Sequence, residues 1–416
     1  MAMPISHVIM MLAGMLILAL MLRPLAGRWQ LPFAALLVLV GFLGSEILVW
    51  SGVDTGLRHD SFHDLIFYVL LPLLVFEAAF KIDAVLLRRN LFVILTLSIP
   101  VLLLSILVTA ALAYVLIDND WGFPWIAALL TGAVLVATDA SPITSQFARL
   151  GVPHRLRVLM EGEDLFNDAT AIVVFGIFLY IAQHPWEDIE AADVALSFLI
   201  VFFGGLFVGL LVGLGFLLVS RLFEDAIQQA MITLISAYTA FIVANEMLKV
   251  SGVMAVLITG LIMGRVIHND FQDERGSFVD TFWSFNVHVA ESLMFLLMGM
   301  TVTLAMFEQR WLAMLIGIAA LLIARAIGIF GTGLLINRLP WTDALPGSYQ
   351  GILFIGSLRG AVVLALSLSL PVDLPYWWTI QSIAFGVVLF SLFVQAPAVV
   401  PLLRRSGLTG VGRGSD

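Results

Sequence analysis

The sequence is built largely from apolar runs of about 20 residues, separated by short segments that hold Gly, Pro and charged residues. A run of this length, wound as an α-helix, crosses the ~30 Å hydrocarbon core of a bilayer. Only 12% of the residues are charged, whereas soluble domains average about 25%. With no cysteine in the chain, disulfides and cysteine nucleophiles are excluded. The sequence therefore predicts an all-α polytopic membrane protein.

Gly, Pro and charge clusters divide the apolar runs into about thirteen predicted transmembrane helices. The predicted spans lie near residues 5–22, 31–50, 62–80, 91–117, 123–147, 156–183, 193–220, 226–248, 251–267, 279–306, 311–336, 348–369 and 375–402. With this division most of the 20 Lys and Arg residues fall on one side of the membrane. Lys and Arg collect on the cytoplasmic side. The pattern predicts an N-terminus outside and a C-terminus in the cytoplasm.

An odd number of spans fits two six-helix repeats of inverted topology joined by a linker helix. The predicted organisation is one transmembrane domain over about 1–404 and a short cytoplasmic tail over 405–416. Within the domain, we expect a first repeat over about 1–183, a linker helix over about 193–220 and a second repeat over about 226–404.

Spans 5 and 12 occupy equivalent places in the two predicted repeats. Each opens with Pro, contains Gly and carries a charged residue further along: Asp139 follows Pro124, and Arg359 follows Pro346. Unwound backbone is tolerated in a membrane only where it is buried in protein or lines a cavity. We therefore expect spans 5 and 12 to be interrupted, crossing helices at a substrate site.

Two aspartates lie deep within the predicted spans 5 and 6. Asp139 precedes the connecting loop near Pro153, and Asp168 follows it at a similar distance along the chain. At 1.5 Å of rise per residue, both carboxylates reach a similar depth near the middle of the bilayer. Free carboxylates there are costly, so each requires water, a counter-charge or a bound cation.

The stretch EGEDLFNDATAIVVF (161–175) carries its acids on two faces of one helix. Glu161, Asp164 and Asp168 are spaced i+3 and i+4 and share a face, whereas Glu163 and Asn167 lie on another. The first face is predicted to line an ion path from the cytoplasm to Asp168. Glu161 is also compatible with a solvated position at the membrane interface.

The second face favours a structural ion pair, for which Arg359 is a natural counter-charge to Glu163. A purely structural role also stays open for Asp139 and Asp168. Glu77, within the apolar run FYVLLPLLVFEAAF, is either a contributor to the site or a helix–helix hydrogen bond.

Five motifs, in order along the chain, resemble one family. EGEDLFNDATAIVVF is similar to the EGESLFND-(G/A)-TAIV signature of monovalent cation:proton antiporters, the NhaP-type and eukaryotic sodium/proton exchangers. LLVFEAAFKID, ATDASP, SGVMAVLITGLIMG and GSLRGAVVLALSLSLP resemble the third-helix, TDP, ninth-helix and GLRG motifs of that family. The resemblance covers almost the whole chain and implies the same fold of thirteen helices and inverted repeats.

The resemblance implies a cation- and proton-binding site without a resident cofactor. The implied ligands of the transported Na⁺ are Thr138, Asp139 and Asp168, with Glu77 close by. Asn167 would belong to an Asn–Asp pair, and Glu163 would pair with Arg359. The family also implies a homodimer.

Two positions depart from the family pattern. The Pro that usually follows the first Asp is Ala140 here, and Pro142 lies two places later. Asp164 stands where a Ser is frequent, so the chain has an additional carboxylate for cation or proton binding.

The predicted function is secondary active transport rather than enzymatic catalysis: electroneutral Na⁺ (or Li⁺)/H⁺ exchange by alternating access, serving pH homeostasis in the plasma (inner) membrane. Electroneutrality follows from the resemblance, because members with Asn before the second Asp are generally electroneutral. K⁺/H⁺ exchange is the alternative. A cation channel needs no inverted repeat, and the Gly-x-Gly-Asp motif of intramembrane aspartyl proteases is absent from the sequence.

Overall fold

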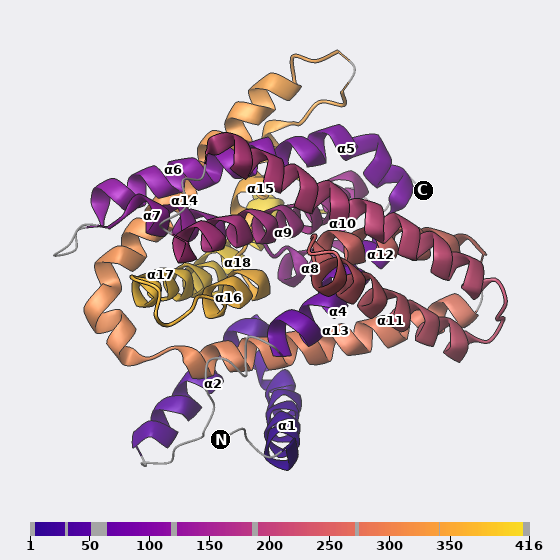
Figure 1. Ribbon diagram of the computed structural model, residues 1–416, viewed down its shortest axis with the longest axis horizontal. Helices are drawn as coiled ribbons and strands as arrows, with labels where there is room; N and C mark the ends of the chain where they lie inside the picture. The colour runs from indigo at the N-terminus through magenta and orange to yellow at the C-terminus, as the bar shows by residue number, and fades with distance from the viewer. Residues whose placement is uncertain are drawn as a thin grey trace.

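The computed structural model describes residues 5–29, 32–50, 65–117, 123–184, 190–270, 274–340 and 342–410. Within these ranges the chain is almost entirely helical (Figure 1). The one β-type contact among the described residues is an isolated bridge. Seven of the described helices are long and apolar enough to cross a membrane, and three shorter apolar helices accompany them. This count is compatible with the thirteen predicted spans. Residues 62–64 of predicted span 3 and 411–416 of the predicted tail lie outside the described residues.

The helices follow the predicted spans closely. In the first half they are α1 (Ile5–Trp29), α2 (Phe33–Trp50), the π-helix η1 (Leu65–Leu70), α4 (Leu71–Lys81), α5 (Ala84–Ser98), α6 (Pro100–Leu116), α7 (Trp125–Val136), α8 (Ser141–Leu150) and α9 (His154–Gln183). After α10 (Ala191–Ser220) come α11 (Ala226–Ile242), η2 (Val243–Met247), α12 (Gly252–Asp270), α13 (Glu274–Thr301), α14 (Leu304–Ile336), α15 (Gly347–Gly356), α16 (Ala361–Leu368), α17 (Trp377–Phe390), η3 (Ser391–Gln395) and α18 (Ala396–Arg405).

Local chemistry sets several helix ends. Asp83 and Asp225 precede α5 and α11, and their carboxylates accept hydrogen bonds from first-turn N–H groups that have no intrahelical partner. The predicted break between the two apolar runs near Lys249 is present: η2 ends at Met247, α12 begins at Gly252, and Lys249 has a φ of 53°.

The helices form two groups, each packed more closely within itself than against the other. Contacts join α1, α2, α4 and α10–α13 in the first group, and α5–α9 and α14–α18 in the second. Glycines permit close approach inside the first group: a Cβ at Gly299 would collide with the Val38 carbonyl, and one at Gly264 with the Phe80 carbonyl. Contacts between the groups are sparse and involve mainly α9 and α16.

Two broken helices cross inside the second group, as predicted for spans 5 and 12. The first break separates α7 from α8, and the second separates α15 from α16. The Asp139 N–H donates to the Leu358 carbonyl at 2.9 Å, so the two unwound segments meet in an antiparallel bridge. Ala140 does not prevent the break. Pro142 lies in the first turn of α8, where the missing N–H of proline is tolerated, so the new helix can start directly after the unwound segment.

Candidate ion-binding site

A cavity of about 60 Å³ lies beside the crossing of the broken helices. The α7–α8 break, α9 of the second group, and α4 and α13 of the first group all contribute side chains to it. Its polar lining residues are Glu77, Thr138, Asp139, Ser141, Asp164, Asp168 and Glu291. The structure thus brings together all five side chains predicted to bind cation or proton. Asn167 is fully buried, but it lines neither this cavity nor the larger one described below.

Several buried oxygens at this cavity have no hydrogen bond of good geometry among the described residues. They are Thr138 Oγ1, Asp164 Oδ1 and Asp168 Oδ1. Buried polar atoms are almost always satisfied by protein or by bound species. Hydroxyl and carboxylate oxygens suit a hard cation. Among the described residues no group of three or more acidic or histidine side chains is drawn tightly enough to hold a metal ion by itself in this conformation.

The Asp139 carboxylate is held by backbone from both broken helices. The Ser141 N–H at the start of α8 donates to Asp139 Oδ1 at 3.2 Å. A Cβ atom at Gly360 would collide with the same carboxylate. Position 360 therefore requires glycine if Asp139 is to keep this place, and the positive end of the α8 dipole faces its charge.

A second cavity of about 560 Å³ adjoins the small one, since the two share lining residues. The shared residues are Glu77, Ala78, Ser141, Asp164, Val287 and Glu291. The predicted polar face of α9 follows this route: Glu161 lines the large cavity, Asp164 lines both and Asp168 lines the small one. The spacing of the three acids thus marks a path inward along one helix face.

Two ion pairs, one within α9 and one within α4, line the large cavity. Arg157 Nε lies 2.8 Å from Glu161 Oε1, and Lys81 Nζ lies 2.5 Å from Glu77 Oε1. Each pair joins residues four positions apart, so each base reaches the acid one turn away on its own helix.

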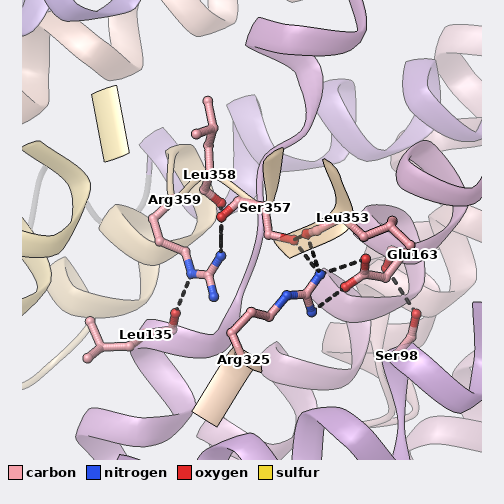
Figure 2. Close-up of polar contacts among 8 residues, drawn as sticks. All are labelled: Ser98, Leu135, Glu163, Arg325, Leu353, Ser357, Leu358 and Arg359. Carbon is pink, nitrogen blue, oxygen red and sulfur yellow. Dashed lines mark hydrogen bonds and ion pairs between the residues drawn. The ribbon is translucent and has the colours of Figure 1, made fainter. Parts of the chain in front are cut away.

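The predicted ion pair between Glu163 and Arg359 was wrong. Glu163 pairs with Arg325 of α14 instead, through distances of 2.6 Å to Arg325 Nη1 and 2.8 Å to Nη2 (Figure 2). The Arg325 guanidinium also donates to the Ser357 hydroxyl at the second break. Glu163 and Arg325 are 2% and 4% exposed, so this pair is a buried structural link between α9, α14 and α15.

Arg359 serves the broken helix ends. Its guanidinium donates to the carbonyls of Leu135 at 2.8 Å, Ser357 at 2.5 Å and Leu358 at 3.3 Å (Figure 2). These carbonyls lie at or just beyond the C-terminal ends of α7 and α15, where helices leave acceptors unpaired and carry partial negative charge. The sequence signal for a different assignment was Arg325 itself, a second arginine inside an apolar span.

The crossing broken helices and the part-buried acids beside them are typical of a polytopic membrane transporter, with a candidate ion site between its two helix groups. The sequence model described as sodium/hydrogen exchanger, transmembrane, matches residues 13–405. The chain belongs to this family.

Two named relatives are similar in sequence to most of this chain. The Na⁺/H⁺ antiporter ApNhaP of Aphanothece halophytica is 34% identical over 383 residues, which cover 92% of this chain and 71% of the relative. The Na⁺/H⁺ antiporter NhaP of Pseudomonas aeruginosa is 31% identical over 355 residues, covering 84% and 82%. The sodium proton antiporter MjNhaP1 of Methanocaldococcus jannaschii, solved at pH 8, superposes with a TM-score of 0.82 at 20% identity, over 97% of this chain and 100% of that one. This likeness confirms the predicted fold class.

Proposed function

We propose that the protein is a secondary active antiporter that exchanges Na⁺ or Li⁺ for H⁺, one cation for one proton. The observation that carries the proposal is the small cavity at the helix crossing, where Thr138, Asp164 and Asp168 present buried oxygens that have no hydrogen bond of good geometry within the described part of the chain. Family membership and the names of the relatives support this assignment.

In the proposed mechanism, Thr138, Asp139 and Asp168 hold the cation, with Asp164 and Glu77 contributing negative charge on the cytoplasmic side. A carboxylate can carry either a cation or a proton, and this exclusion couples the two fluxes. Relative movement of the two helix groups would expose the site to each side in turn. Asn167, Glu163 and Arg359 support the site without binding the ion.

The proposed setting is the plasma (inner) membrane, with the N-terminus outside, the C-terminus in the cytoplasm and pH homeostasis as the role. The larger cavity would then open to the cytoplasm, because its lining includes two basic residues at helix ends, Lys81 at the end of α4 and Arg157 in the first turn of α9. We also propose a homodimer of single transmembrane domains, as the family resemblance implies.

Everted membrane vesicles test the exchange directly. A trapped pH dye is quenched by respiration, and Na⁺, Li⁺ or K⁺ is then added in turn. We expect dequenching with Na⁺ and Li⁺. A response to K⁺ alone would replace the proposal by K⁺/H⁺ exchange, the second candidate, and a cation flux without proton movement would identify a channel.

Variants test the site. Asp139→Asn and Asp168→Asn should each abolish exchange while the protein stays folded and inserted, because an amide fills the space but cannot trade a proton for an ion. Asp373→Asn, at an exposed acid outside both cavities, is the matched control and should retain activity. Near-normal exchange in either site variant would remove that aspartate from the mechanism.

A further inference from the structure

Lys81, the last residue of α4, places a protein cation in the lining of the large cavity. Its ammonium nitrogen lies 2.5 Å from Glu77 Oε1 and donates to Ser284 Oγ of α13 at 2.7 Å. Lys81 lines the large cavity, whereas Glu77 lines both cavities. An ion moving inward therefore reaches the Lys81–Glu77 pair before it reaches Asp168.

The pair has the properties of an exchangeable contact. The side chains are 33% and 17% exposed, so the ammonium group lies at the edge of water and not in a sealed core. Lysine carries a compact charge on a flexible stem with several rotatable bonds. Releasing Lys81 from Glu77 thus requires no backbone movement and leaves a carboxylate free beside Asp164.

We propose that Lys81 is a tethered competitor for the transported cation at Glu77 and so sets the apparent affinity for Na⁺ on the side of the large cavity. This inference rests on the proposed exchange function. An incoming cation gains the Glu77 carboxylate only when Lys81 turns away, and each cation bound there displaces one protein charge. Lys81 acts through Glu77 and is a positioning residue, not a ligand.

The hydrogen bond to Ser284 offers a competing role for Lys81, which is to hold α4 against α13. Three single variants separate the two roles. Lys81→Gln removes the charge and keeps hydrogen-bonding capacity, and Lys81→Arg keeps the charge. Ser284→Ala removes only the hydrogen bond between α4 and α13.

The measurement is the Na⁺ dependence of dequenching in everted vesicles, which gives an apparent KM and a maximum rate for each variant. We expect Lys81→Gln to lower KM by about 2- to 5-fold, the range given by partly exposed ion pairs in double-mutant cycles, with a maximum rate close to that of the wild type. Lys81→Arg and Ser284→Ala should keep the wild-type KM. An unchanged or raised KM in Lys81→Gln, or an equal fall in Ser284→Ala, would overturn the proposal.

A second measurement needs no turnover. Purified protein in detergent is titrated with NaCl, against choline chloride at equal ionic strength, and the melting temperature gives the Na⁺ affinity by linkage. Lys81→Gln should tighten binding in the wild-type background and have no effect in a Glu77→Gln background. Equal tightening in both backgrounds would show that Lys81 does not act through Glu77. A wild type without any Na⁺ response in vesicles or in detergent would overturn the exchange function as well, whereas an active wild type with an unaffected Lys81→Gln variant would overturn this inference alone.

Discussion

At the residue scale, three charged side chains are buried in the largely apolar core of the second helix group. Glu163, Arg325 and Arg359 are all nearly inaccessible, and each charge has partners that offset its loss of hydration. Breaking a buried pair from one side leaves a charge without compensation, which typically costs about 3–5 kcal/mol. Removing any one of these three side chains is therefore expected to lower the stability of the fold.

We expect Arg325→Ala and Glu163→Ala each to lower thermal stability by an amount on this scale, and the double variant to lose much less than the sum of the two. Melting curves of the detergent-solubilised protein measure the coupling. Arg359→Ala is the comparison, because it strips three backbone carbonyls of a donor and leaves the Glu163 pair intact. Strictly additive losses for Glu163 and Arg325 would contradict the pairing.

A residue outside the membrane gives a pH-dependent prediction. Hydrogen bonds from the Leu86 N–H, then from His154 and the Val85 N–H, hold the pKa of Asp83 below its usual 3.8, against the raising effect of partial burial. Because the pKa of Asp83 is lower in the folded state, its contribution to stability is complete at a pH above the unfolded-state pKa. This contribution is lost as the pH falls through the folded-state pKa.

The melting temperature of Asp83→Ala should therefore lie below that of the wild type at pH 7, by the equivalent of about 1 kcal/mol for a helix cap. The gap should close below about pH 4. Asp83→Asn retains a capping oxygen without the charge, so its deficit at pH 7 should be smaller than that of Asp83→Ala and should shrink over the same pH range, because the titrating carboxyl is that of the wild type. A gap that widens toward acid pH would contradict the assignment.

At the element scale, the broken helices are defined by close backbone contact rather than by side-chain packing. Gly360 lies against the Asp139 carboxylate, and the Asp139 N–H is bound to Leu358. The position of one aspartate is thus fixed by a glycine in the other repeat.

Gly360→Ala should displace Asp139 and reduce exchange strongly while the protein still inserts. Gly351→Ala is the matched control, because a Cβ atom added at this position on α15 has no non-local heavy atom within 4 Å. It should keep activity and gain stability, since alanine is favoured over glycine within a helix by roughly 0.5–1 kcal/mol. Comparable exchange by the two variants would show that Asp139 need not sit against residue 360.

The patterns of hydropathy and charge in the sequence predicted the helices and both helix breaks, because helices and breaks depend on local composition. The partner of Glu163 was not predictable in this way, because the distance along the sequence says nothing about which of two buried arginines faces it. The roles differ for a geometric reason. Arg359 lies inside a break and donates to backbone carbonyls, whereas Arg325 projects from the helical part of α14 that follows its kink at Arg310. The contact of Lys81 with Ser284 was not predictable either, because it joins two helices that lie far apart in the sequence.

At the scale of the whole molecule, the charge carried across the membrane is the quantity to measure. If one exchangeable carboxylate charge is cancelled by either Na⁺ or H⁺, the loaded site crosses with equal charge in both directions. Voltage, worth about 2.3 kcal/mol per charge per 100 mV, then has nothing to act on. Asp164 lines both cavities and is the additional acid that can disturb this balance.

In proteoliposomes clamped with K⁺ and valinomycin, Na⁺-driven proton movement should be independent of the imposed potential. Asp164→Ser should preserve exchange while shifting its Na⁺ affinity or its pH range. If an inside-negative potential speeds or reverses proton movement in the wild type, more than one charge titrates. Loss of that voltage effect in Asp164→Ser would then assign the second charge to Asp164.

The division of the lining acids between the two helix groups has a further consequence. Asp139, Asp164 and Asp168 belong to one group, whereas Glu77 and Glu291 belong to the other. If the groups slide past each other during exchange, the ion travels with the three aspartates and leaves the two glutamates behind. The same ion then experiences different fields at the two ends of its journey. Such a transporter would hold the cation with unequal strength at its two faces even when the solutions on both sides are identical.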